Sequence, residues 1–181
     1  LWAEAGLPDR GPETWEEMTE WGKPIQAKLS GRERAHGWGN AVDYLSWTFE
    51  GPLWTMGGAY SDGWDAKLTS PETVKAVEWL KSTVDDGWAT VSNDLANEFG
   101  TGILGSIVAS TGDLAGINKT ADFEVGTAFL PNPKGDGGCP TGGAGLAIPS
   151  GSSEERQNNA ANFIDFIPNA ENTAHRPRHA G

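Results

Sequence analysis

The apolar residues of this chain recur at helical spacing in two long segments. In the segment 15–29 they lie three or four positions apart, which predicts an amphipathic helix that Pro24 kinks or breaks. A second helix is predicted from Pro71 to about Gly87, because Ser70 is a favourable N-cap and proline suits the first helical position. The apolar stripe expected on this second helix consists of Val74, Val77, Leu80 and Val84.

Shorter apolar segments between the helices have the character of strands. The segment 103–109 is a largely apolar run typical of a buried strand, and the segment 123–130 has the alternation of a strand. A short helix is predicted over 93–99, a further strand over 144–148 and an amphipathic helix over 160–166. Strands interleaved with helices of this length predict an α/β fold, with a sheet covered by helices.

Composition excludes several classes of partner. The chain of 181 residues has a formal net charge of −12. Such a charge argues against binding to nucleic acid, which needs a basic surface, and against an anionic membrane surface. No apolar run approaches the ~18 residues of a spanning helix, so direct membrane insertion is not expected. The single cysteine, Cys139, cannot form an internal disulfide, and we interpret it as a small buried or loop residue.

Patterns of catalysis and metal binding are weak. The chain has neither a Gly-x-Ser-x-Gly nucleophile elbow nor a phosphate-binding P-loop. The glutamates of the segment 13–20 lie on one predicted helix, which is typical of a solvated face. Of the three histidines, only His175 and His179 have a ligand-like spacing, so zinc is not expected. We therefore expect no catalytic residues, no metal and no cofactor.

Two candidate binding residues lie in a turn after a short predicted strand. Trp38 could present its ring to the C–H faces of a sugar or polyol, or it could cover the core. Because the chain has nine tryptophans, composition alone favours the core. Asn40 could bind ligand hydroxyls, or it could cap the next helix.

Further candidates lie in two later turns. Ser110 and Thr111 follow a predicted strand and precede a helix, where they could hold an anionic or polyhydroxyl group. The alternative is a plain N-cap, in which Thr111 or Asp113 only satisfies the donors of the helix. Gly142 and Gly143 precede a predicted strand, and glycines there allow backbone N–H groups to approach a ligand closely. The alternative is a turn that needs glycine only for its geometry.

Several short motifs resemble the extracellular solute-binding proteins of ABC importers, of the carbohydrate and glycerol-3-phosphate type. Each motif is weak alone, but five of them follow the family's order over nearly the whole chain. They lie in the segments 1–15, 57–73, 98–105, 123–148 and 160–172. The final residues 175–181 depart from the family pattern.

This resemblance implies a fold similar to the type II periplasmic-binding proteins. Residues 1–130 would form most of the C-terminal-type lobe and 131–181 an incomplete part of the N-terminal-type lobe, so the chain would be an internal fragment. It implies an extracytoplasmic substrate-binding component, periplasmic or lipoprotein, although no signal sequence is recognisable in this chain. Such a protein captures a small carbohydrate, polyol or glycerophosphate-type ligand between its lobes and delivers it to the membrane subunits of an ABC permease.

The resemblance also bears on the site. An aromatic residue at the position of Trp38 commonly faces the ligand in this family, which favours a binding role, and a segment similar to 109–117 contacts it. We expect Trp38, Ser110, Thr111 and Gly143 to converge on one concave surface, because open α/β sheets bind ligands beyond the carboxyl ends of their strands. Asp113 stands where serine is usual, and its carboxylate would repel phosphate, which favours a neutral sugar or polyol.

The alternative class is a secreted carbohydrate-active enzyme or a lectin-like carbohydrate-binding module. Exposed aromatic residues such as Trp38 would hold a polysaccharide. The catalytic carboxylates would then be found among Asp43, Asp62 and Glu98.

Overall fold

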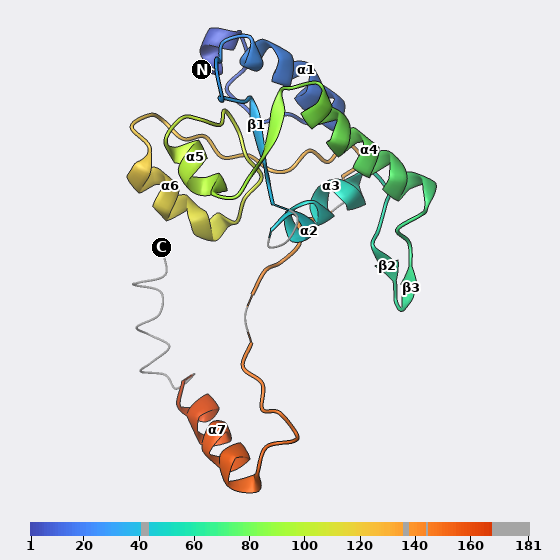
Figure 1. Ribbon diagram of the computed structural model, residues 1–181, viewed down its shortest axis with the longest axis vertical. Helices are drawn as coiled ribbons and strands as arrows, with labels where there is room; N and C mark the ends of the chain where they lie inside the picture. The colour runs from blue at the N-terminus through green and yellow to red at the C-terminus, as the bar shows by residue number, and fades with distance from the viewer. Residues whose placement is uncertain (41–43, 136–137, 144, 168–181) are drawn as a thin grey trace. The chain divides into compact units, whose positions relative to one another are not determined.

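The computed structural model describes residues 1–40, 44–135, 138–143 and 145–167 (Figure 1). Packing divides the chain into two compact units, Leu1–Pro140 and Thr141–Gly181. The elements of the first unit are η1 Ala3–Ala5, α1 Trp15–Gln26, β1 His36–Gly39, α2 Leu45–Thr48, α3 Glu50–Thr55, β2 Ser61–Asp62, β3 Asp65–Ala66, α4 Pro71–Asp85, β4 Ala89–Ser92, α5 Leu95–Gly100, η2 Thr111–Asp113 and α6 Leu114–Thr120, and the second unit contains α7 Glu154–Phe166.

A small parallel sheet forms the centre of the first unit. Strands β1 and β4 pair in parallel, with Gly37 opposite Thr90. Gly37 also forms a parallel bridge with Ile107, and a strand has only two edges, so the segment 104–107 lies on the other side of β1. All three segments run in the same direction, and the connections between them contain helices, as parallel pairing requires. The expected α/β fold is confirmed.

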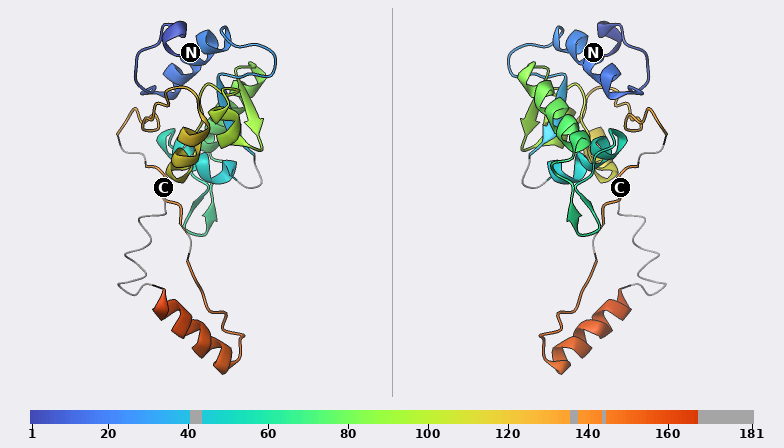
Figure 2. Two further views of the ribbon diagram at one scale, coloured as in Figure 1. Left: turned by 90° about the vertical axis from the view of Figure 1, so that its left-hand side faces the viewer. Right: turned by 90° about the vertical axis from the view of Figure 1, so that its right-hand side faces the viewer.

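Helices cover both faces of this sheet. Successive residues of a strand point to opposite faces. The indole of Trp38 points to the α4 face, where its Nε1 donates to Oγ1 of Thr83 over 2.9 Å. On the opposite face a Cβ added to Gly37 would lie 2.9 Å from a methyl group of Leu95 in α5, so only glycine leaves room there. Helices α4 and α5 accordingly lie on opposite sides of the strands (Figures 1 and 2).

The strand predictions in the second half of the chain are mostly wrong. The segment 103–109 contributes only bridges, and within the residues that the structure describes neither 123–130 nor 145–148 forms a strand. Residue 144 lies outside the described residues. A strand needs a neighbouring backbone as hydrogen-bond partner. Phe129, an apolar residue of the segment predicted as a strand from its alternation, is fully exposed.

The long helices form as predicted, but α4 buries a different face from the one that its apolar stripe predicts. In α1 the predicted apolar positions are buried, and the helix continues through Pro24 to Gln26. In α4 the most buried side chains include Thr73 and Thr83, whereas Val74 and Val77 are exposed. Both threonine hydroxyls have partners in the interior, which removes the cost of burying them: Thr73 donates to the carbonyl of Ala59 over 3.0 Å and Thr83 accepts from a buried indole.

Two helical glycines lead to opposite stability predictions. A Cβ on Gly22 in α1 would lie 2.5 Å from the ring of Trp88, whereas a Cβ on Gly116 in α6 would meet nothing within 4 Å. We expect Gly22→Ala to lower the free energy of unfolding by about 1–3 kcal/mol through overpacking. Gly116→Ala should raise it by up to about 1 kcal/mol through helix propensity. Urea denaturation followed by circular dichroism measures both, and a change of the same sign in the two variants would contradict the assigned packing.

The second unit is described by itself. Its helix α7 begins after Ser153, whose Oγ accepts from the backbone N–H of Arg156 over 3.5 Å, and it includes the amphipathic segment expected at 160–166. The unit begins at Thr141, ten residues after the division expected from the sequence, and the assignment of the two units to lobes stays a prediction. No helix in the described parts of the chain is long and apolar enough to cross a membrane.

Candidate functional site

The carboxyl edge of the parallel sheet gathers several of the candidate residues. Strand β1 ends at Gly39, and Asn40 follows it directly. The carbonyl of Asn40 accepts hydrogen bonds from the backbone N–H groups of Tyr44 (3.2 Å) and Leu45 (2.8 Å), which turns the chain into α2. Ser110 and Thr111 follow the neighbouring segment 104–107 at the same edge, because that segment runs parallel to β1. Such edges are the usual ligand sites of open α/β sheets.

Tyr44 connects these two turns. Its hydroxyl donates to Oδ2 of Asp113 over 2.9 Å and accepts from the backbone N–H of Ser110 over 2.6 Å. Burial, and next the hydrogen bond to Asp113, raise the pKa of Tyr44 to about 12, although the Ser110 N–H acts in the opposite direction. The phenol is therefore protonated at neutral pH. Its ring lies edge-on to that of Trp47, with centroids 5.7 Å apart.

Sequence reasoning missed Tyr44 as a site residue. The available signal was an aromatic residue with a polar tip four positions after Asn40 in one turn, among only two tyrosines in the chain. Its partner lies 69 residues away, so the hydrogen bond is visible only in the folded structure.

Ser110 acts as a local cap. Its Oγ accepts from the backbone N–H of Gly112 over 3.2 Å, at the start of η2. Thr111 is exposed in the first position of η2. The cap therefore comes from Ser110 and not from Thr111 or Asp113, since Asp113, at the N-cap of α6, forms no side-chain capping hydrogen bond. Contact of Ser110 or Thr111 with a ligand stays a prediction.

Trp38 does not face this edge. Its side chain is 0% exposed. It packs edge-on against Phe49 and Trp79, with ring centroids 6.3 Å and 5.8 Å away, and its Nε1 is hydrogen-bonded to Thr83. The prediction that its ring contacts a ligand is therefore wrong, because a side chain enclosed on all sides by its own core has no surface to offer.

Gly142 and Gly143 belong to the second unit and are exposed there. A Cβ added to Gly143 would meet nothing within 4 Å, so close packing does not require this glycine. Convergence of the glycine pair with Ser110 and Thr111 stays a prediction.

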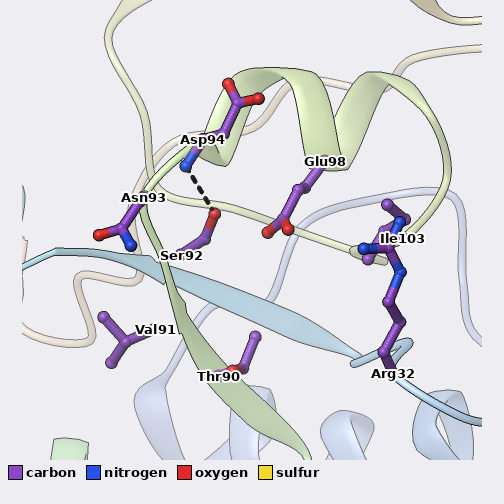
Figure 3. Close-up of a pocket in the computed structure, with 8 residues that line it drawn as sticks. All are labelled: Arg32, Thr90, Val91, Ser92, Asn93, Asp94, Glu98 and Ile103. Carbon is purple, nitrogen blue, oxygen red and sulfur yellow. Dashed lines mark hydrogen bonds between the residues drawn. The ribbon is translucent and has the colours of Figure 1, made fainter.

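A polar pocket of about 300 Å³ lies beside β4 and α5 (Figure 3). At its rim Oγ of Ser92 accepts from the backbone N–H of Asp94 over 3.0 Å. Glu98, a carboxylate of the enzyme alternative, projects into this pocket from α5. Asp62 lies in the β2–β3 hairpin, at the other side of the first unit from α5 in Figure 1, and Asp43 lies outside the described residues. Glu98 and Asp62 therefore do not pair as an acid and a base.

Metal binding has no support in the described residues. No group of three or more histidine, cysteine, aspartate or glutamate side chains among them could hold a metal ion. Cys139 is free and exposed, so of the two alternatives, a small buried residue or a loop residue, only the loop residue fits.

Comparison with known proteins adds information on relatives. The family model described as bacterial extracellular solute-binding protein matches residues 1–176. The sn-glycerol-3-phosphate-binding periplasmic protein UgpB of Salmonella typhimurium is 28% identical over 183 residues, which cover 94% of this chain and 41% of that protein. The protein of the same name from Escherichia coli K12 is 27% identical, with the same coverage.

A solved structure matches more closely. The crystal structure of UgpB from Mycobacterium tuberculosis in complex with glycerophosphocholine is 53% identical and superimposes with a TM-score of 0.85. The match covers 99% of this chain and 47% of that one. The chain thus spans less than half the length of the relatives to which it is similar.

Proposed function

The chain belongs to the bacterial extracellular solute-binding proteins, and we propose that it forms one ligand-binding wall of the substrate-binding component of an ABC importer. Its fold is part of the type II periplasmic-binding-protein fold. The family is a class of binding proteins and not of enzymes. The component acts outside the cytoplasm, as the names of the periplasmic relatives from Salmonella typhimurium and Escherichia coli indicate. It delivers its ligand to the membrane subunits of the permease.

The proposed ligand is of the glycerophosphate type. Support comes from relatives named for sn-glycerol-3-phosphate and from a 53% identical protein solved with glycerophosphocholine. Within this chain, the observation that supports the proposal is the position of the Tyr44 hydroxyl. Its hydrogen bonds connect the turns that follow two parallel segments at the carboxyl edge of the sheet. A polyol chain has hydroxyls that such a cluster of polar groups can bind.

The proposal predicts weak but localised binding by this chain. Because one wall of a two-lobed site contributes only part of the contacts, we expect a dissociation constant in the millimolar range, or roughly −4 kcal/mol. Addition of glycerophosphocholine should shift the amide NMR signals of Tyr44, Ser110, Thr111 and Gly112. Tyr44→Phe should weaken binding about three- to tenfold, since one hydrogen bond contributes about 0.5–1.5 kcal/mol.

The other tyrosine of the chain provides a matched control. Tyr60 donates its hydroxyl to the backbone carbonyl of Ser46 in α2 over 2.7 Å, whereas the hydrogen bonds with Ser110 and Asp113 are those of Tyr44. Tyr60→Phe removes the same atom, and binding should be unchanged. Equal losses of affinity in the two variants, or shifts that avoid the carboxyl edge altogether, would contradict the proposal.

A further inference from the structure

We infer that Tyr44 and Asp113 form an acceptor-only subsite, which takes the hydroxylated or cationic end of the ligand and selects against a phosphate monoester. This inference rests on the proposed function and assigns a role to two residues within that site. It concerns which end of a glycerophosphodiester lies at this edge, and which ligands the edge rejects.

The direction of the hydrogen bonds determines what this subsite can bind. A phenol hydroxyl has one donor proton and two acceptor positions. The proton of Tyr44 goes to Asp113, and one acceptor position is used by the N–H of Ser110. The remaining acceptor position of Tyr44 can receive a hydrogen bond but cannot give one. The ionised carboxylate of Asp113 likewise only accepts.

Phosphate oxygens do not suit such a subsite. They are hydrogen-bond acceptors, so they would face Tyr44 and Asp113 without a proton between them. Coulomb repulsion from the half-buried carboxylate of Asp113 adds to this mismatch. A phosphate monoester carries about −1.5 to −2 charges at pH 7 and is rejected most strongly. Glycerol hydroxyls donate protons to the same oxygens and are favoured.

A positive headgroup suits the same place. The carboxylate of Asp113 attracts it, and the rings of Tyr44 and Trp47 are each half-buried, which leaves aromatic surface beside that carboxylate. Aromatic faces attract quaternary ammonium groups. The subsite therefore accepts either the glycerol end or the choline end of glycerophosphocholine, and the phosphate between these two ends lies away from Asp113.

A series of three ligands with increasing negative charge tests the subsite. Glycerophosphocholine has no net charge, glycerophosphoglycerol has one negative charge, and glycerol 3-phosphate has nearly two. NMR titration of the parent chain should give affinities that fall in this order. Asp113→Asn should improve the binding of glycerol 3-phosphate relative to glycerophosphocholine about tenfold, or about 1.4 kcal/mol. Asp113→Ser, which also removes the charge, should give the same change, whereas Asp113→Glu should keep the selectivity of the parent.

Asp62→Asn is the control for net charge, because it removes one exposed carboxylate from the β2–β3 hairpin and should leave the ratio unchanged. An unchanged ratio in both Asp113→Asn and Asp113→Ser would overturn the inference while leaving the proposed function intact. An equal change in Asp62→Asn would overturn it too, because the effect would then follow from net charge. If none of the three ligands binds the parent chain, the proposed function fails, and the inference fails with it.

Discussion

Replacement of Trp38 by alanine should lower the free energy of unfolding by about 3–5 kcal/mol, as expected for removal of a large buried aromatic side chain. Trp38 is 0% exposed and lies between α4 and the sheet. The variant also loses the hydrogen bond to Thr83 and the edge-on contacts to Phe49 and Trp79. Urea denaturation followed by far-UV circular dichroism gives the free energy.

Trp64 provides the matched control for this experiment. It lies in the turn between β2 and β3 and is fully exposed, so Trp64→Ala should change stability by no more than about 0.5 kcal/mol. Trp38→Phe, which retains an aromatic ring, should fall between the two. If Trp38→Ala were as stable as the parent and only lost affinity for glycerophosphocholine, Trp38 would be a ligand residue after all and its assigned place in the core would be wrong.

Acidification from pH 7 to pH 5 should destabilise the chain by about 2 kcal/mol through His36 alone. Burial lowers the pKa of His36 to about 3 from a usual value of 6.5. The unfolded chain therefore binds a proton as the pH falls below 6.5, while the folded chain does not, and stability is lost progressively from 6.5 down to about 3. The size follows from 1.36 kcal/mol for each pH unit in this window.

The surroundings of His36 explain why its protonated form is disfavoured in the folded chain. Oγ of Ser106 donates to the carbonyl of Ala35 over 2.8 Å, so Nδ1–H of His36 donates to Ser106 over 2.9 Å. Nε2 is then the bare nitrogen, and among the described residues it has no hydrogen-bond partner. A charge on this ring would lie against the indoles of Trp38 and Trp88 without a counter-ion.

His36→Asn removes the titrating ring and keeps a donor for Ser106. The variant itself can be less stable, but its free energy of unfolding should fall by about 2 kcal/mol less between pH 7 and pH 5 than that of the parent. Urea denaturation at several pH values measures this difference in slope. Equal slopes for parent and variant would show that His36 is not the buried neutral group described here.

The predicted elements succeeded where the information is local. The capped start at Ser70 and the periodic apolar residues of α1 are properties of neighbouring residues, and both helices form as expected. The strand prediction for 123–130 failed because alternation states only that one face could be buried, not that a backbone partner exists. The same limit applies to α4, where Thr83 is buried and Val77 is exposed. Whether a threonine hydroxyl can be buried depends on a hydrogen-bond partner that lies far away in the sequence.

The sequence indicates the region of the candidate site, and the structure changes which residues are candidates there. That ligands bind beyond the carboxyl ends of parallel strands is a rule of topology, so Asn40 and Ser110 could be placed at one edge from the order of elements. Trp38 could not be excluded from the candidate ligand residues, because a tryptophan in a binding turn and a tryptophan of the core can have the same neighbours in the sequence. Tyr44 could not be included, because its importance rests on hydrogen bonds to Ser110 and Asp113 across 66 and 69 positions.

By itself the sequence determined the α/β class, the long helices and the family. Periodicity, caps and short motifs all depend on residues that are close together in the sequence. Only the tertiary structure decided which aromatic residue lies in the core and which lies at the carboxyl edge of the sheet. Trp38 is enclosed because Thr83 of α4 supplies a hydrogen-bond acceptor inside the core, and Tyr44 is held at the edge because Asp113 takes its proton there. Both outcomes depend on which polar partner lies within about 3 Å after folding, and that distance is fixed by the packing of the whole unit.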